Sequence, residues 1–98
     1  MEVRRRKKIL EFIALRDAKA RKLFPASLDD VEQAEWKTPS NIKQRHRTAD
    51  FLPGNRVVFN LGDNDYRIVV VIDYTRQVVL IRWVGYHKDY DKINSATV

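Results

Sequence analysis

The chain has 98 residues, a hydrophobic fraction of 44% and no cysteine, which excludes a disulfide scaffold, a thiol nucleophile and a cysteine zinc site. It contains only two histidines, so a compact histidine metal centre is not expected. No apolar run has the character of a signal peptide or the length of a membrane span, and we expect a cytoplasmic protein.

Charge is unevenly distributed along the chain, whose net charge is +6 at pH 7. Residues 1–22 carry a net +6, residues 23–36 a net −4 and residues 37–47 a net +4. Two basic blocks of this kind favour a polyanionic partner, of which nucleic acid is the commonest. A solvated helix face that keeps a small domain soluble explains such blocks equally well.

The N-terminal part predicts a short edge strand and two helices. Residues 1–5 alternate apolar and polar side chains, as a short strand does. Residues 6–22 predict an amphipathic helix, in which the stripe at helical spacing contains Ile9, Phe12, Ile13 and Arg16. Pro25 should end or kink this helix. Ser27 should then cap a second helix whose buried stripe reaches Trp36.

The C-terminal part predicts a sheet. Residues 37–54 contain two prolines and indicate a long connection with at most one short helical turn. Residues 55–61, 66–74 and 77–85 then predict three strands of an antiparallel meander, with the first hairpin turn in GDND, residues 62–65. We therefore expect one α+β domain over residues 1–98, with two N-terminal helices packed on one face of a three- to four-stranded antiparallel sheet.

Alternation along the strands predicts two unlike faces, provided that both hairpin loops contain an even number of residues. The apolar face should lie against the helices and comprises Val57, Phe59, Leu61, Tyr66, Ile68, Val70, Ile72, Tyr74, Val79, Ile81 and Trp83. The other face mixes valines with Arg56, Arg67 and Arg82. These arginines would repel one another unless an anion, or a carboxylate such as Asp73, lay between them.

The stretch VGYHKDYDKI, residues 84–93, carries the candidates for catalysis. If residues 87–90 form a helical turn, His87 and Tyr90 project from the same side, just after the strand that carries Arg82. A histidine can exchange a proton near neutral pH, and arginines can stabilise a phosphorane, which together suffice for metal-independent RNA cleavage by the 2′-OH. Taken alone, this spacing favours a plainer interpretation, a surface histidine and a tyrosine that covers a sheet edge.

Three further aromatic residues lie outside these motifs. His46 lies in a basic loop, where it would assist a phosphate contact or have no function. Trp36 and Trp83 each fall on an apolar periodic face, and we interpret both as core residues rather than base-stacking platforms.

Three segments, taken together and in order, resemble a known family: WKTPSNIKQRHRTADFL, NRVVFNLGDNDYRIVVVIDY and VLIRWVGYHKDYDKI. They look like the HigB-type toxins of bacterial toxin–antitoxin systems, distant relatives of the RelE endoribonucleases. The resemblance covers residues 36–93 and is most specific at Tyr66–Arg67 and in the ending Gly85-x-His87-x-x-Tyr90-Asp91.

The resemblance implies a RelE-like fold and an mRNA interferase that cleaves ribosome-bound transcripts, without metal or cofactor, and so inhibits translation and growth. The implied partner is a HigA-like helix-turn-helix antitoxin, through which alone the chain would reach operator DNA. No membrane association is implied.

The resemblance also implies roles for individual residues. Arg67 would hold the scissile phosphate, and His87 and Tyr90 would complete the catalytic motif. From the charge pattern and the resemblance together, we expect RNA contacts from Lys37, Arg45, Arg47, Arg56, Arg82 and Lys88. The sequence departs from its relatives at Pro25, within their second helix, and at Tyr86, where a threonine is frequent and where the change could alter the shape of the site.

Two other classes of protein are consistent with the same residues. A non-catalytic RNA- or ribosome-binding module would share the electrostatics but would not need proton exchange at His87. A regulatory subunit would keep its sheet face covered by another protein.

Overall fold

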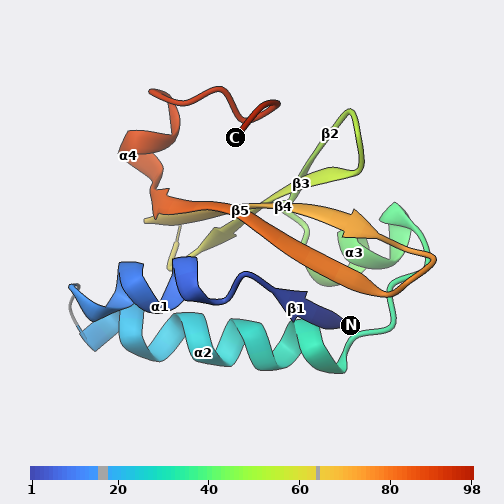
Figure 1. Ribbon diagram of the computed structural model, residues 1–98, viewed down its shortest axis with the longest axis horizontal. Coiled ribbons are helices and arrows are strands. Elements are labelled where there is room, and N and C mark those ends of the chain that lie inside the picture. The colour runs from blue at the N-terminus through green and yellow to red at the C-terminus, as the bar shows by residue number, and fades with distance from the viewer. Residues whose placement is uncertain (16–17, 64) are drawn as a thin grey trace.

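A computed structural model describes residues 1–15, 18–63 and 65–98, and in these ranges five strands form one mixed sheet (Figure 1). The elements are β1 (Glu2–Arg4), α1 (Lys7–Ala14), α2 (Ala18–Gln33), α3 (Pro39–Arg45), β2 (Asp50–Leu52), β3 (Arg56–Leu61), β4 (Tyr66–Asp73), β5 (Val78–Tyr86) and α4 (His87–Tyr90). Arg16 and Asn64, which belong to the predicted stripe and turn, lie outside the described residues. No helix in these ranges is long and apolar enough to cross a membrane.

The α+β class is confirmed, whereas the predicted sheet had too few strands and lacked the parallel pair. The sheet has the order β1-β5-β4-β3-β2. Its three central strands form the predicted antiparallel meander, and β2 joins β3 antiparallel. The edge strand β1 pairs with β5 in parallel, through Val3 opposite Val79. Strands of three residues are too short for the sequence pattern to give their partner or direction.

The break between the first two helices was predicted in the wrong place. Helix α1 ends at Ala14, and α2 runs from Ala18 to Gln33 with Pro25 inside it. The buried stripe of α2 explains this continuity, because Ala20, Phe24 and Leu28 lie one helical turn apart and all reach the core. Pro25 lies on the exposed side of this helix, and burial of the stripe outweighs the helical hydrogen bond that proline cannot donate.

The connection after α2 is more ordered than predicted. Helix α3 has seven residues rather than a single turn. Thr38 caps it: its hydroxyl accepts from the Asn41 amide while the Asn41 side chain accepts from the Thr38 amide. Pro39 occupies the first helical turn, where its missing N–H is harmless. Thr38 and Pro39 therefore mark the start of a helix, whereas the prediction interpreted this proline as the sign of a loop.

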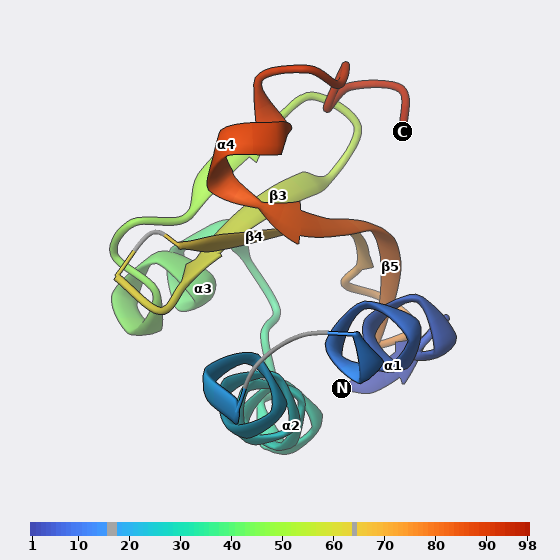
Figure 2. The same cartoon turned by 90° about the vertical axis from the view of Figure 1, so that its left-hand side faces the viewer.

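The helices and the C-terminal segment lie on opposite sides of the sheet. Figures 1 and 2 show α1 and α2 beneath it, and α4 with the chain that follows above it. An aromatic cluster fills the core near the start of β4, where ring centroids of Phe12, Phe24, Tyr66 and Tyr86 lie 5.4–6.1 Å apart in the contacting pairs. This cluster fixes the strand ends from which the residues on the upper face project.

A β-bulge in β5 changes the predicted faces. Both hairpin loops contain four residues, and the alternation holds as far as Ile81. The register then passes from Val70 opposite Ile81 to Val69 opposite Trp83, so Arg82 is an extra residue. Beyond it every side chain changes face. Trp83 therefore lies on the upper face with Arg67, and its assignment to the core was wrong, whereas Trp36 is buried as predicted.

Candidate functional site

The centre of the candidate site is the pair formed by Arg67 and Tyr90. Arg67 is the second residue of β4, on the face away from α1 and α2, and Tyr90 ends α4. The guanidinium carbon lies 4.5 Å from the centroid of the tyrosine ring, a cation–π contact that orients the fork of the arginine. No carboxylate of the described residues lies within ion-pair distance of Arg67, whose buried Nε has no hydrogen-bond partner among them. The pair therefore presents an uncompensated positive charge.

Trp83 supports Tyr90 from beneath. Their ring centroids lie 6.1 Å apart at an interplanar angle of 66°. The indole in turn packs against Gly85, the residue opposite Arg67 in the ladder, where a Cβ would lie 2.5 Å from two indole carbons. Gly85 is needed because only hydrogen fits beneath this ring. The prediction missed Trp83 as a site residue, because alternation alone gives no sign of a bulge.

His87 begins α4 at the same end of the sheet. Its amide donates to the carbonyl of Asp65 at 2.9 Å, which continues the ladder one step beyond the pair Tyr66–Tyr86. By this register, positions 65 and 87 lie on the same side of the sheet as Arg67 and Gly85. The structure thus brings the three predicted catalytic residues, Arg67, His87 and Tyr90, to one end of the sheet, where Arg67 contacts Tyr90.

Tyr86 does not shape this face. Its ring lies 5.5 Å from both Phe12 and Tyr66 on the helix side of the sheet. The expectation that a tyrosine in place of threonine could alter the site was therefore wrong, because the bulge turns position 86 towards the core. Lys88 is exposed on α4, and its Nζ lies 5.3 Å from the centroid of the Tyr86 ring.

Arg56 and Arg82 form a second cationic group on the upper face. Arg56 Nη1 donates to the main-chain oxygens of Ser95 at 3.2 Å and Val98 at 2.9 Å. Arg82 Nε donates to the same Val98 oxygen at 2.9 Å. Asp73, the carboxylate that sequence reasoning placed between the arginines, instead accepts from the amide of Arg76 at the far end of β4. Main-chain oxygens of the C-terminal segment take that place.

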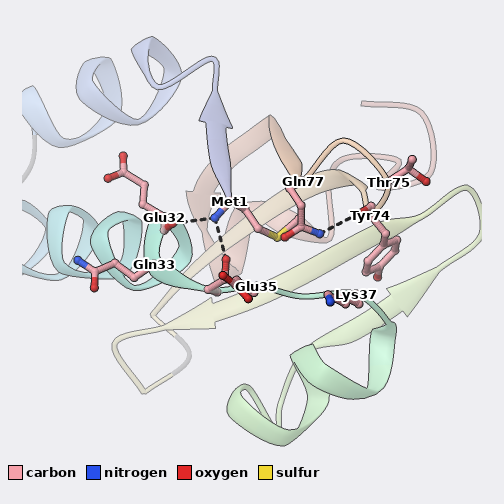
Figure 3. A pocket seen from close by; sticks show the side chains of 9 residues that line it. Met1, Glu32, Gln33, Glu35, Lys37, Tyr74, Thr75 and Gln77 are labelled. Carbon is pink, nitrogen blue, oxygen red and sulfur yellow. Dashed lines mark hydrogen bonds between the residues drawn. The ribbon is translucent and has the colours of Figure 1, made fainter.

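Lys37 lies far from this face. It lines a pocket of about 490 Å³ together with Glu32, Glu35 and the β4–β5 hairpin (Figure 3). Beside it, the amino group of Met1 donates to main-chain oxygens at the end of α2. Residues 68–73 of β4 separate this pocket from Arg67, a distance of roughly 20 Å at strand geometry.

The other predicted basic contacts are also dispersed. Arg45 is paired with Asp30 at 2.5 Å, which ties α3 to α2. This ion pair lowers the pKa of the Asp30 carboxyl and raises that of Arg45. Arg47 is exposed in the loop between α3 and β2. The structure brings neither of them to Arg67, and their RNA contacts stay predictions.

His46 belongs to an aromatic group rather than to a phosphate site. Its ring lies 4.9 Å from Phe59 and 5.5 Å from Trp36, both edge to face. Burial lowers its pKa and outweighs the opposing effect of Asp30, whose carboxylate is 3.6 Å from Nε2. The buried Nε2 has no hydrogen-bond partner among the described residues. His46 is thus a half-buried residue of the core edge.

The groups gathered on the upper face define the available chemistry. They are guanidinium donors, an imidazole and a phenol, which bind and stabilise an oxyanion and transfer protons. Among the described residues, no three His, Asp or Glu side chains are grouped so as to hold a metal ion.

Comparison with known proteins identifies the class and then the family. The five-stranded mixed sheet with two helices beneath it is consistent with a RelE-like toxin. The family model of the HigB toxins, described as the RelE-like toxic component of a toxin–antitoxin system, matches residues 20–93. The chain therefore belongs to the HigB toxin family, and an antitoxin is its expected partner as a component of such a system. No curated protein gave a significant match.

Proposed function

We propose that this protein is an mRNA interferase, a ribosome-dependent endoribonuclease that cleaves messenger RNA, without a metal ion, and so inhibits translation and growth. The observation that carries the proposal is the stacking of Arg67 on Tyr90 at the strand end from which His87 begins α4. Family membership supports a toxin, and this arrangement supports a phosphate-directed one.

The proposed reaction is an internal transesterification. The 2′-oxygen of the RNA forms a bond to the adjacent phosphorus while the bond from phosphorus to the 5′-oxygen breaks, leaving a 2′,3′-cyclic phosphate and a 5′-hydroxyl. One proton leaves the 2′-hydroxyl and one reaches the departing 5′-oxygen. His87 performs one of these two transfers. Arg67 stabilises the additional negative charge of the phosphorane, because guanidinium hydrogen bonds strengthen as that charge develops.

Tyr90 positions Arg67 through its ring and presents its hydroxyl to the reacting groups. Trp83 and Gly85 keep that ring in place. Arg82, Arg56 and Lys88 bind neighbouring phosphates of the strand, and Lys37, Arg45 and Arg47 contact ribosomal RNA or mRNA backbone farther away. The proposed antitoxin is a HigA-like helix-turn-helix protein, which supplies the contact with operator DNA.

Induced expression in a bacterial host tests this proposal. Wild-type protein should stop growth and cleave transcripts, whereas Arg67→Ala and His87→Ala should restore growth and leave transcripts intact. Arg76→Ala is the matched control, because Arg76 is exposed at the far hairpin and forms an ion pair with Asp73, three residues earlier. Killing and cleavage by both site variants at wild-type levels would exclude this site.

The uncompensated charge of Arg67 also fits a non-catalytic RNA- or ribosome-binding module. The variant His87→Gln separates the two functions, because glutamine keeps polarity and approximate size but does not exchange a proton. A binding module should retain its growth inhibition with this substitution, whereas the nuclease should lose it.

A further inference from the structure

The segment from Asn94 to Val98 folds back over the face of the sheet that carries the candidate site. Figures 1 and 2 show the chain after α4 running above the strands, on the side opposite α1 and α2. Beneath this side lie Val58 and Val69, which face each other across β3 and β4 and are both 0% exposed. They are not part of the core cluster that the helices cover.

Two arginines from different strands converge on this segment. Arg56 of β3 and Arg82 of the β5 bulge donate to one and the same oxygen, that of Val98, each at 2.9 Å. Arg56 also donates to the oxygen of Ser95 at 3.2 Å. Two guanidinium groups that share one oxygen atom match the way in which arginines bind a phosphate oxygen.

Main-chain oxygens, rather than acidic side chains, accept the hydrogen bonds of these two arginines. No Asp or Glu of the described residues lies within ion-pair distance of Arg56 or Arg82. A phosphodiester brings a full negative charge and two free oxygens, so it can accept hydrogen bonds from both guanidinium groups at this position.

We propose that Arg56 and Arg82 form a second phosphate subsite, for a nucleotide neighbouring the one cleaved at Arg67, and that residues 94–98 occupy it until RNA displaces them. The segment is an internal competitor, so the free toxin binds RNA less tightly than its arginines allow. This inference rests on the proposed function, because it assigns the RNA strand to the same face.

The segment is held in a way that permits its release. It forms one local turn, in which the Asn94 carbonyl accepts from the amides of Thr97 and Val98, each at 3.1 Å. The Asn94 side chain accepts from the amide of Ala96, also at 3.1 Å. Asn94, Ala96 and Thr97 are exposed, so few apolar contacts oppose its departure. Nucleobases of the incoming strand can then cover Val58 and Val69, because their flat faces are apolar.

Binding of a non-cleavable RNA tests the competition. The probe is a fluorescent 2′-O-methyl RNA oligonucleotide, whose blocked 2′-oxygen prevents cleavage, and the readout is anisotropy. A chain ending at Ile93 should bind about tenfold more tightly than the full chain, a difference typical of one competing hydrogen-bonded contact. In an Arg56→Ala/Arg82→Ala background the truncation should have no effect. Equal or weaker binding by the truncated chain in the wild-type background would overturn the inference.

A second variant distinguishes the competition from a loss of folding in the truncated chain. Asn94→Ala keeps the full length and removes one hydrogen bond of the turn, and it should tighten RNA binding about two- to threefold. Amide exchange at Thr97 and Val98 in the unmodified protein should accelerate when the probe binds. Unchanged affinity in Asn94→Ala together with unchanged exchange contradicts the competition, even if the truncated chain is unfolded.

The result of this test can be told apart from a failure of the proposed function. Transcript cleavage that depends on His87, with RNA affinity unaffected by residues 94–98, would remove the competitor and leave the nuclease. Tighter binding after truncation, without any cleavage by the wild-type chain, would remove the nuclease and leave the competitor.

Discussion

The indole of Trp83 lies against the main chain of Gly85 so closely that a Cβ at position 85 would be 2.5 Å from two carbons of the ring. The same indole contacts the ring of Tyr90, which stacks on Arg67. A substitution at Gly85, which has no reactive side chain, should therefore disturb Arg67, the arginine proposed to hold the scissile phosphate.

Gly85→Ala should reduce cleavage much more than it reduces stability. The added methyl group must displace Trp83, and with it Tyr90, and a displacement of about 1 Å at a reacting centre typically costs on the order of 100-fold in rate. The measurement is the single-turnover cleavage rate beside the thermal midpoint. Gly54→Ala is the matched control, because its φ of +80° strains the backbone while nothing lies within 4 Å of the new methyl group. A normal rate in Gly85→Ala would contradict the coupling.

Substitutions at Tyr90 should separate its ring from its hydroxyl. Tyr90→Phe keeps the cation–π contact with Arg67 and should bind non-cleavable RNA normally while cleaving it more slowly. Tyr90→Leu loses the contact as well. The loss of a cation–π interaction worth about 0.5–1 kcal/mol should weaken RNA binding severalfold. Anisotropy and cleavage rates measured on both variants check this. Equal binding by the two variants would show that the ring does not orient the arginine.

Folding stability should fall on acidification because of His46. Burial lowers the pKa of its imidazole in the folded state below the ordinary value of 6.5, so the unfolded chain binds the proton more readily. Its contribution is fully present above pH 6.5 and is lost as the pH falls through the lowered folded-state pKa. Urea unfolding at pH 7.5 and 5.5 should show this decrease, and His46→Gln should reduce it. A His46→Gln variant with an undiminished pH dependence would rule out this cause.

Pro25→Ala should stabilise the protein. Proline inside a helix costs about 3 kcal/mol relative to alanine, and part of this is offset because proline restricts the unfolded chain, so a net gain of about 1–2 kcal/mol is expected. Pro25 is exposed, and the alanine methyl meets no core residue. Urea unfolding gives the free-energy difference. A loss of stability would indicate that the chain needs the proline where α2 passes this position.

The central sheet could be predicted from the sequence because its signals are local and strong. Runs of valine and isoleucine bounded by turns define β3, β4 and β5, and the even loop lengths give the register as far as Ile81. The parallel pairing of β1 with β5 depends on the path of the chain through α1 and α2. Three residues carry no information about that path.

The errors have two physical sources. Pro25 carries a strong local signal against helix, which the burial of Phe24 and Leu28 overrides. The bulge at Arg82 carries no local signal at all, so Trp83 was assigned to the core and its contact with Tyr90 was missed. The placement of Arg67, His87 and Tyr90 at one end of the sheet could be predicted, whereas the separation of Lys37 from them required the fold.

The chemistry of the cut ends tests the central claim most directly. Purified protein should cleave a ribosome-bound mRNA, and mass spectrometry of the fragments should find a 2′,3′-cyclic phosphate and a 5′-hydroxyl at each cut. A single 2′-deoxynucleotide placed immediately before the cut should abolish cleavage there, because the nucleophile is missing. Fragments with 5′-phosphate ends, or undiminished cleavage of the 2′-deoxy substrate, would contradict attack by the 2′-hydroxyl.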